Sequence, residues 1–407
     1  MTILVSSAHY HLSDKYGSEA QWGVDLLNSW AALGHQVHAV AGVAEMAGRL
    51  HPNVRLTHFA SRRSTNPLVE IARKLYYPLY AWFNSWRIFS KLRGRVDLVV
   101  HIAPVSPVSF DLFFLLHPRT RAVFMLGPAQ PPASEDTPQA LGRVLGTGSS
   151  FTVRGLYLLL HLAFPLLHAL FRATLARAQG VIVPTSLAKN YYRQFISPAQ
   201  IYIIPVGTKP PSPARSFRRI PGRPLNLLYV GYLTSRKGVD ILLQACRQLV
   251  SRHAFTDFHL TVVGSGEELP SLQELTRTLD LNSYVDFVGF VDHARISVYY
   301  RRADVFCSPT RFEPYGMTVI EALSFGLPAV VSRVNSLPEL VGDAALLAVP
   351  DDPDDLAAQL HRLLTHAALR SSLARKAAAR FTKLFTWDKI SRDWLAVYER
   401  ISPRHQV

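Results

Sequence analysis

The chain has 407 residues, of which 48% are hydrophobic and 18% charged, a composition that excludes disordered, collagen-like and disulfide-stapled proteins. Two domains are expected, because a single hydrophobic core rarely grows beyond about 250–300 residues. Lys and Arg number 44 against 29 Asp and Glu, which gives a net charge of +15. This excess favours anionic partners such as nucleotides, nucleic acid or an anionic membrane surface, without choosing among them.

The N-terminus and the two cysteines favour a cytoplasmic protein. Residues 1–5 (MTILV) are a short apolar run without a basic leader or cleavage site, so we expect a first strand there and no signal peptide. Cys246 and Cys307 cannot form a disulfide framework and are predicted to be buried free thiols in a reducing compartment.

The first half of the chain alternates β-rich runs with helical patterns. A helix is predicted at residues 22–33, ending at Gly34. Such alternation is typical of a parallel sheet with right-handed crossovers, so residues 1–205 are predicted to form an α/β domain. The apolar stretch at residues 156–171 is shorter than the roughly 20 residues of a membrane span. We expect a packed interior helix there, with a second membrane contact as the alternative. The strands predicted for this half lie at 3–6, 36–40, 96–101, 122–126 and 181–184.

The second half repeats this organisation after an interruption. Residues 206–224 contain five prolines and little apolar periodicity, so a linker is predicted. Residues 225–385 are predicted to form a second α/β domain, and residues 386–407 a C-terminal helix that crosses back to the first. Two such domains joined by a hinge predict a central cleft. The strands predicted for this half lie at 226–230, 259–263, 285–288, 305–308 and 329–332.

The segment 311–321 (RFEPYGMTVIE) is the strongest candidate for a functional site. It follows a predicted strand, and Pro314 and Gly316 place Glu313 before the first turn of the next helix. Glu321 then lies about one turn inside that helix. The free N–H groups at the start of a helix can bind phosphate, and the two carboxylates suit sugar and ribose hydroxyls. The alternative interpretation is a capping acid followed by a solvated helical Glu.

A second candidate is the loop at residues 231–238 (GYLTSRKG), which also follows a predicted strand. Gly231 and Gly238 at its ends, with Arg236 and Lys237 between them, suit a loop that places a cation on a diphosphate. The spacing is not that of a Walker A loop. A solvated basic loop is the alternative interpretation.

Two further patterns argue against cofactors. Gly264 and Gly266 follow a predicted strand, but Leu269 stands where a dinucleotide-binding fingerprint has its next glycine. The sequence has no His/Cys cluster with metal-ligand spacing, so no metal site is predicted.

The two candidate segments together resemble the retaining nucleotide-sugar glycosyltransferases of family 4. Glu313 and Glu321 match the E-x7-E element of that family, and residues 231–238 match its G-x-L-x-x-x-K-G element. The resemblance implies the GT-B fold, an α/β architecture of two Rossmann-like parallel-sheet domains facing a central cleft. It covers almost the whole chain, loosely in the N-terminal half, and also includes residues 17–19 (GSE), 33–37 (LGHQV), 326–331 (GLPAVV) and 338–345 (PELVGDAA).

The resemblance also implies a role for each matched residue. Lys237, with Arg236, contacts the donor diphosphate. Glu313 faces the transferred sugar, and Glu321 binds the ribose. Lys237, Arg236 and Glu313 are therefore the catalytic candidates. The other donor-binding positions are Gly17, Gly231, Phe290, Val291, Tyr315, Gly316, Met317 and Thr318.

The implied reaction moves a sugar from a UDP-, GDP- or ADP-linked donor to an acceptor with retention of anomeric configuration and without a metal ion or cofactor. The chain departs from the family pattern at Tyr232, where an Arg is common, so one phosphate contact is lost or Arg236 replaces it. The His that many members carry in the N-terminal domain is absent from residues 125–128 (MLGP). His101 is the nearest substitute on the acceptor side, and a simple strand-end residue is the alternative.

Residues 62–95 are the one informative stretch about the acceptor. This stretch begins at Arg62, ends at Arg95 and holds eight basic residues against one acid, Glu70. Basic residues around an aromatic-rich helix favour an anionic membrane surface, and some membrane-associated relatives dock in this way. A lipid-linked or glycan acceptor at the inner membrane face is therefore predicted, with a buried helix and solvated basic ends as the alternative. The aromatic residues are Tyr76, Tyr77, Tyr80, Trp82, Phe83, Trp86 and Phe89.

Two other classes of function stay in view. Nucleotide-sugar epimerases and phosphorylases share the fold, but the Glu313/Glu321 element argues against the former and the chain length against the latter. A catalytically degenerate membrane or nucleic-acid binding protein with the GT-B fold is the main alternative to a transferase. Nucleic acid is not a predicted partner, because the sequence holds no motif that recognises bases.

Overall fold

The chain divides into two compact units. Met1–Pro205 and Ser391–Val407 form one, here called the N-terminal domain, and Val206–Ile390 forms the other, the C-terminal domain. The computed structural model describes residues 1–7, 11–13, 18–45, 50–62, 64, 66–92, 95–103, 111–117, 122–126, 165–166, 168–211 and 222–401. Gly17, residues 127–128, most of 156–171 and residues 212–221 of the predicted linker lie outside the described part of the chain.

The N-terminal domain is built on an eight-stranded sheet in the order β2-β3-β1-β5-β6-β7-β8, with β4 beside β3, and every pair is parallel. The strand β3 is buried along most of its length, as expected of a strand covered on both faces. The strands are β1 (Thr2–Ser7), β2 (His11–Ser13), β3 (Gln36–Glu45), β4 (Val54–Ala60), β5 (Leu98–Ala103), β6 (Ala122–Leu126), β7 (Gly180–Val183) and β8 (Ile201–Ile203).

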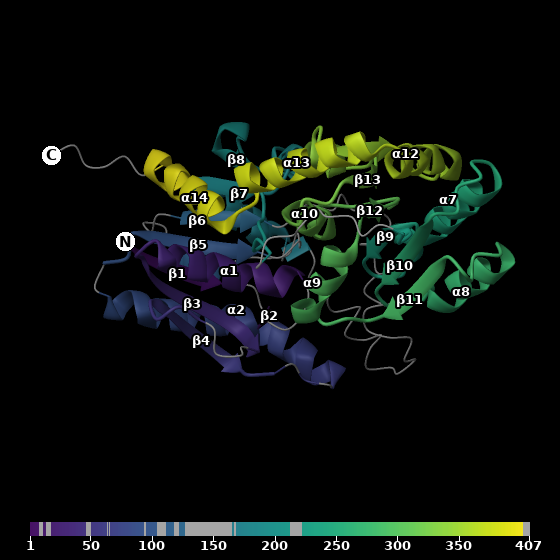
Figure 1. The fold of residues 1–407 in the computed structure, drawn as a ribbon. Helices are drawn as coiled ribbons and strands as arrows, with labels where there is room; N and C mark the ends of the chain where they lie inside the picture. Colours follow the sequence, from purple (N-terminus) through teal and green to yellow (C-terminus); the bar gives the residue numbers. More distant parts are fainter. Residues whose placement is uncertain are drawn as a thin grey trace. The chain divides into compact units, whose positions relative to one another are not determined.

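Helices cover both faces of this sheet. Figure 1 shows α1 in front of the strands and α2 behind them. Tyr77 of α2 donates a hydrogen bond to the carbonyl of Val40 at 3.1 Å, and Ser85 donates one to the carbonyl of Ser6 at 2.9 Å. These bonds fix α2 against β3 and β1. The helices are α1 (Ser18–Ala32), α2 (Pro67–Lys91), α3 (Leu112–Leu116), the 3-10 turn η1 (Pro198–Gln200) and α6 (Ser186–Tyr192).

The last helix, α14 (Trp387–Ile401), returns the chain to the N-terminal domain from Ser391 onward. Trp394 packs edge-on against Trp30 of α1, with ring centroids 5.3 Å apart. Tyr398 donates a hydrogen bond to the carbonyl of Asp97 at 3.0 Å. The N-terminal domain is therefore made from two separate segments of the sequence.

The C-terminal domain is built on a six-stranded parallel sheet in the order β11-β10-β9-β12-β13-β14. In order of appearance this is 3-2-1-4-5-6, the doubly wound Rossmann order, in which the direction of winding switches between the first and fourth strands. The expected α/β class with parallel sheets is thus confirmed in both domains. The strands are β9 (Leu225–Val230), β10 (Phe258–Val263), β11 (Val285–Gly289), β12 (Val305–Ser308), β13 (Ala329–Ser332) and β14 (Ala345–Ala348).

The core of the C-terminal domain is a cluster of fully buried aliphatic side chains from the central strands and from α7. Cys246 and Cys307 lie in this cluster as free, buried thiols, as predicted. Burial raises the pKa of Cys246 to about 12, so its thiol stays protonated. The described helices and 3-10 turn of this domain are η2 (Ser235–Lys237), α7 (Val239–Ser251), α8 (Leu269–Thr278), α9 (His293–Arg302), α10 (Met317–Ser324), α11 (Leu337–Val341), α12 (Pro353–Thr365) and α13 (Ala367–Leu384).

Within the described ranges, no helix combines the length and the apolar character needed to cross a membrane.

The close approach of two backbone segments at Gly264 can be tested by substitution, with Gly222 as a control in open space. Gly264 follows β10 with φ +146°, and a Cβ there would lie 1.8 Å from the carbonyl oxygen of Gly231. Gly264→Ala is therefore expected to lower the free energy of unfolding by about 2–5 kcal/mol. Gly222 has φ +77° but open space around the missing Cβ, so Gly222→Ala is expected to cost only about 1 kcal/mol. Denaturant unfolding of both variants measures the difference, and equal losses would contradict the close approach.

Candidate functional site

The two candidate segments lie at the switch point of the C-terminal sheet. The cation loop follows β9, and the Glu313 segment follows β12, the strand hydrogen-bonded beside β9. In doubly wound sheets, ligands bind in the crevice at the carboxyl ends of the strands at this point. The fold thus brings together two motifs that are far apart in the sequence.

The cation loop is pressed directly against the loop that follows β12. Ser235–Lys237 form a single 3-10 turn, closed by Gly238 at φ +66°. A Cβ at Gly238 would lie 2.1 Å from the carbonyl oxygen of Pro309, so only glycine permits the contact. The carbonyl of Arg236 accepts hydrogen bonds from Thr310 Oγ1 at 3.0 Å and from the backbone N–H of Arg311 at 2.9 Å.

This contact pairs two of the predicted catalytic residues. Lys237 Nζ lies 2.5 Å from Glu313 Oε2, and the two side chains are only 15% and 10% exposed. The backbone N–H of Glu313 donates to Asn335 Oδ1 at 3.3 Å, and that of Tyr315 lies 3.5 Å from Glu313 Oε1. The carboxylate is therefore held in a defined orientation beside its cation.

Arg236 is placed differently from Lys237. Its Nη1 donates to the carbonyl of Phe312 at 3.0 Å, and the side chain is exposed. Part of its guanidinium therefore braces the loop after β12. Its other N–H groups are the ones that can face an anion.

Arg311, the first residue of the candidate segment and one for which the sequence predicted no role, anchors the same loop. It donates two hydrogen bonds to Asp240 of α7, at 2.9 and 2.7 Å, and one to Asp351 at 2.5 Å. These hydrogen bonds, that with Asp240 above all, raise the pKa of the Arg311 guanidinium above its usual value. A two-pronged Arg–carboxylate pair fixes geometry as well as charge, so Arg311 ties the site to α7.

The helix α10 begins at Met317, after Glu313, as Pro314 and Gly316 predicted. Gly316 is its N-cap with φ +100°, and a Cβ there would lie 2.7 Å from Leu337 Cδ2. None of the described side chains caps this helix. The first N–H groups of a helix have no intrahelical acceptor, so those at the start of α10, including Thr318, can serve an anion.

Tyr315 turns its side chain into the domain. Its hydroxyl donates to the carbonyl of Val206 at 2.7 Å and accepts a hydrogen bond from the Val206 N–H. Burial raises the pKa of Tyr315 far above its usual value, so the hydroxyl stays neutral. Only the backbone of Tyr315 is left for a ligand.

Glu321 lies in α10 and is held by two residues of α9 that the sequence analysis missed. The hydroxyl of Tyr300 donates to Glu321 Oε2 at 2.7 Å, and His293 Nε2 lies 3.0 Å from Oε1. Tyr300 is fully buried, and burial together with the Glu321 charge raises the pKa of its hydroxyl well above the usual value. Both oxygens of Glu321 are therefore oriented by α9, and it contacts these residues rather than the Lys237–Glu313 pair.

Two aromatic side chains at the carboxyl edge of this sheet are exposed. Phe290 follows Gly289, the last residue of β11, which has φ +80°. Phe290 is 66% exposed and Tyr232, which follows Gly231 at the end of β9, is 69% exposed. Val291 is half-buried beside Phe290. A flat apolar surface suits a nucleobase or a sugar face.

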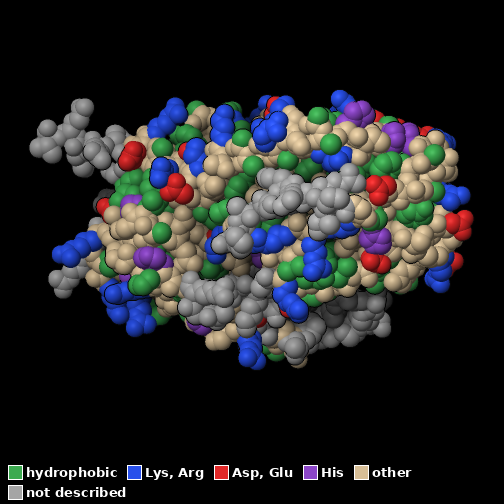
Figure 2. Space-filling view, in the orientation of Figure 1, with side chains coloured by type: hydrophobic (Ala, Val, Ile, Leu, Met, Phe, Trp, Pro, Cys, Tyr) green, Lys and Arg blue, Asp and Glu red, His purple; other side chains and the backbone are tan. Residues whose placement is uncertain are grey.

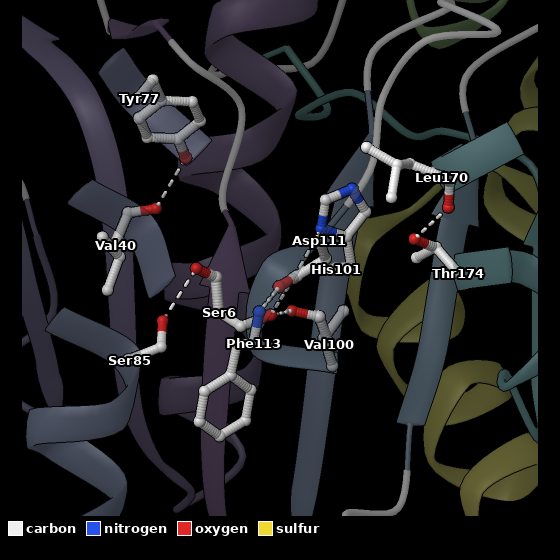
Figure 3. A network of polar contacts seen from close by, with 10 residues as sticks. All are labelled: Ser6, Val40, Tyr77, Ser85, Val100, His101, Asp111, Phe113, Leu170 and Thr174. Atoms are coloured by element: carbon white, nitrogen blue, oxygen red, sulfur yellow. Dashed lines mark hydrogen bonds and ion pairs between the residues drawn. The ribbon is translucent and has the colours of Figure 1, made fainter. Parts of the chain in front are cut away.

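In the N-terminal domain, His101 is part of a buried polar network (Figure 3). His101 Nδ1 lies 2.8 Å from Asp111 Oδ2, and Ser6 donates to the same oxygen at 2.5 Å. Asp111 Oδ1 accepts the N–H of Phe113 at 2.8 Å. His101 lies within β5 rather than at its end. Its side chain is buried, and Asp111 orients it. Asp111 lies outside the strands, directly before α3, and no local sequence signal links it to Ser6.

Metal ligation is a separate question. Among the described residues, no group of three or more His, Cys, Asp and Glu side chains is arranged to hold a metal ion.

A comparison with known families explains this arrangement. Residues 213–380 match the family model described as glycosyl transferases group 1. The matched segment lies within the C-terminal domain and covers less than half of the chain. The resemblance seen in the sequence is thereby confirmed.

Known proteins are similar to this chain over part or all of its length. Mannosylfructose-phosphate synthase from Agrobacterium fabrum is 34% identical over 181 residues, 42% of this chain and 40% of that one. The chain spans less than half the length of the first curated relatives that it matches.

Solved structures of glycosyltransferases share the fold across both domains. Sucrose-phosphate synthase from Thermosynechococcus elongatus superposes with a TM-score of 0.66 at 24% identity, covering 98% of both chains. Anabaena HepE in complex with UDP superposes with a TM-score of 0.65 at 16% identity, covering 98% of this chain and 100% of that one. The chain thus has the GT-B fold, as predicted.

The Lys237–Glu313 pair is expected to be energetically coupled. Because both side chains are largely buried, Lys237→Met or Glu313→Gln alone is expected to lower the free energy of unfolding by about 2–4 kcal/mol. The double variant is expected to lose less than the sum, with a coupling of about 1–3 kcal/mol. Denaturant unfolding of the four proteins measures the cycle. The exposed pair Arg252–Asp354 serves as control and is expected to couple by less than about 1 kcal/mol. Additive losses at the first pair would contradict the contact.

Proposed function

We propose that the protein transfers a sugar from a nucleotide-diphosphate donor to an acceptor, with retention of anomeric configuration and without a metal ion. The observation that carries the proposal is the Lys237–Glu313 pair, buried at the sheet switch point beside the start of α10. The match of residues 213–380 to the group 1 glycosyltransferase family model supports it.

The donor diphosphate would bind between the cation loop and the start of α10. Departure of the nucleotide builds negative charge on its phosphate, and fixed positive groups stabilise that charge. Positive charge would come from Lys237 and from the exposed part of Arg236. The N–H groups after Gly316 would add the dipole of the helix start. Metal-independent stabilisation of the leaving group therefore fits the side chains present.

The two carboxylates would bind the two sugars of the donor. Glu313 stands before the helix, within reach of what Lys237 binds, and we assign it to the transferred sugar. Glu321 lies deeper in α10, and we assign it to the ribose hydroxyls. Tyr300 orients its Oε2 and leaves Oε1 to exchange His293 for a hydroxyl.

The base and the acceptor are assigned more coarsely. Phe290 and Val291 would lie against the base of a UDP-, GDP- or ADP-linked donor, and the UDP complex of Anabaena HepE makes UDP the first to test. The N-terminal domain, with His101, would bind a glycan or lipid-linked acceptor. We place the enzyme in the cytoplasm, at the inner face of the membrane.

A thermal-shift panel of UDP, GDP and ADP tests the donor site. One nucleotide is expected to raise the unfolding temperature by about 2–4 °C at saturation, because it binds only the folded protein. The shift is expected to vanish in Lys237→Ala and to persist in Lys376→Ala, an exposed lysine of the same domain. A shift of equal size in both variants would contradict the role of Lys237.

A transfer assay with the nucleotide sugar so identified tests the chemistry. Glu313→Gln keeps the size of the side chain but removes its charge, and it is expected to lower kcat by about 100-fold or more. Glu321→Gln is expected to act mainly on the KM for the donor. NMR of the product is expected to show the anomeric configuration of the donor, and chelators to leave the rate unchanged. An inverted product, or full activity of Glu313→Gln, would overturn the assignment.

A further inference from the structure

The side chain of Tyr315 ties the loop of the candidate site to the point where the chain enters the C-terminal domain. Its hydroxyl donates a hydrogen bond to the carbonyl of Val206 at 2.7 Å and accepts one from the N–H of the same residue. Val206 is the first residue of this domain, and both side chains are buried. One hydroxyl therefore pairs with the N–H and the carbonyl of a residue 109 positions earlier in the sequence.

The point of entry lies beside the point where the chain leaves this domain. A Cβ at Gly207 would stand 2.5 Å from the carbonyl oxygen of Phe385 and 2.6 Å from Ile390 Cδ1. The N–H of Thr208 donates to the same carbonyl at 3.1 Å. Ile390 is the last residue of the domain before the chain returns to the N-terminal domain. The two ends of the C-terminal domain are therefore bonded to each other.

The helix α13 supports this contact, because Phe385 is its C-cap residue. Figure 2 shows Lys and Arg side chains along the upper edge of the view, where Figure 1 has α13. Lys376 and Lys383 are exposed on this helix, whereas Ala377 and Phe381 are buried on its inner side. The same helix packs against α10, at whose start the donor phosphate is proposed to bind. The two ends of the domain and the site thus share one packed neighbour.

Two names are useful for the parts that Tyr315 connects. We call residues 206–208 and 385–390 the crossing. The anion seat is the set of backbone N–H groups of residues 316–318, and it begins directly after Tyr315. The hydroxyl contact fixes the backbone of Tyr315, so it also fixes the first N–H group of the seat. Small displacements of such groups weaken a binding site, because hydrogen bonds depend steeply on geometry.

A different contact holds the residue before Tyr315. Ser336, which follows β13, donates a hydrogen bond to the carbonyl of Pro314 at 3.0 Å. That contact ties the loop to a neighbouring loop of the same sheet edge. Tyr315 instead reaches Val206, at the end of the domain. A shift of the crossing can therefore reach the anion seat through a single side chain.

We propose that Tyr315 is a positioning residue that couples the anion seat to the crossing. A phosphate in the seat stabilises the bonded arrangement of the crossing, and a disturbed crossing weakens the binding of phosphate in the seat. Coupling between two sites has to act in both directions. The inference rests on the proposed donor site, and it gives the Tyr315 side chain a role that needs no contact with the ligand.

The packing of Tyr315 does not by itself require a hydroxyl. A phenylalanine would fill the same space, and a buried hydroxyl is tolerated only when it is hydrogen-bonded. Both hydrogen bonds of this hydroxyl go to Val206. Burial raises the pKa of Tyr315 far above its usual value, so the neutral hydroxyl can donate and accept at once. The polar atom of Tyr315 thus serves the crossing alone.

A purely structural anchor is the competing interpretation. Removing such an anchor would lower the free energy of unfolding but leave the nucleotide affinity of the folded protein unchanged. Coupling predicts a change in affinity, and it also predicts that nucleotide alters the crossing. Measurements on the folded protein, well below its unfolding temperature, separate the two interpretations.

Calorimetric titration of the full chain with UDP, GDP and ADP measures the affinity. Tyr315→Phe removes both hydrogen bonds and keeps the ring, and the Kd of the nucleotide that binds is expected to rise about fivefold or more. The control Tyr77→Phe removes a buried hydroxyl that donates to the carbonyl of Val40 in the N-terminal domain. Its Kd is expected to equal that of the wild type.

Amide hydrogen exchange measures the crossing directly. Saturating nucleotide is expected to slow exchange at Thr208 by about fivefold or more in the wild type, because the coupling is reciprocal. In Tyr315→Phe this slowing is expected to vanish. The N–H of Thr208 donates to Phe385 and not to Tyr315, so its response reports transmission rather than the loss of an acceptor.

Gly207→Ala disturbs the crossing from its other side, since the new Cβ would meet the carbonyl of Phe385. Its Kd for the nucleotide is expected to rise about fivefold or more when Tyr315 is present. In the Tyr315→Phe background the same change is expected to alter Kd by less than about twofold, because the tie is already cut. If Gly207→Ala does not fold, the exchange of Thr208 decides alone.

Two results would overturn the proposal. One is a Kd that Tyr315→Phe leaves unchanged, and the other is an equal effect of nucleotide on Thr208 exchange in Tyr315→Phe and the wild type. Circular dichroism on the same samples verifies that the variants are folded. If no nucleotide binds the wild type, the proposed donor site fails and the coupling fails with it. Binding that Lys237→Ala abolishes and Tyr315→Phe leaves intact would remove the coupling alone.

Discussion

Lys237 and Glu313 meet because two loops from neighbouring parallel strands are pressed together where Gly238 touches the carbonyl of Pro309. Their strands, β9 and β12, are adjacent only because the sheet reverses its winding between them. Arg311 then ties the second loop to α7 through Asp240. The positions of Lys237 and Glu313 relative to each other depend on that backbone contact, so this part of the site is a product of sheet topology as much as of its side chains.

The α/β class, the parallel strands and the start of α10 followed from local sequence. Alternating apolar runs predict strands and helices, and a Pro and a Gly before Met317 fix the start of a helix. The partners that orient the site could not be predicted. Tyr300 reaches Glu321, and Asp240 reaches Arg311, across folded elements rather than along the chain. A single sequence carries no signal for such pairs.

Both domains hold buried polar side chains near the carboxyl ends of parallel strands, each through its own partners. In the C-terminal domain, the buried carboxylates Glu313 and Glu321 are each held by a partner from another element, at the carboxyl ends of the strands. In the N-terminal domain, Asp111 orients His101 and Ser6 in the same part of its own sheet. Both domains therefore use the same edge of a parallel sheet, where loops are free to differ while the strands stay regular.

The return of α14 to the N-terminal domain makes the C-terminal domain an insertion rather than an appended module. The N-terminal domain is continuous in space but interrupted in sequence between Pro205 and Ser391. Exchanging the C-terminal domain for that of a relative would need two junctions, and the second falls within a helix. A chimera joined only near Val206 would replace Trp394 and its packing on Trp30 as well. In a domain exchange, the end of the chain therefore belongs with its beginning.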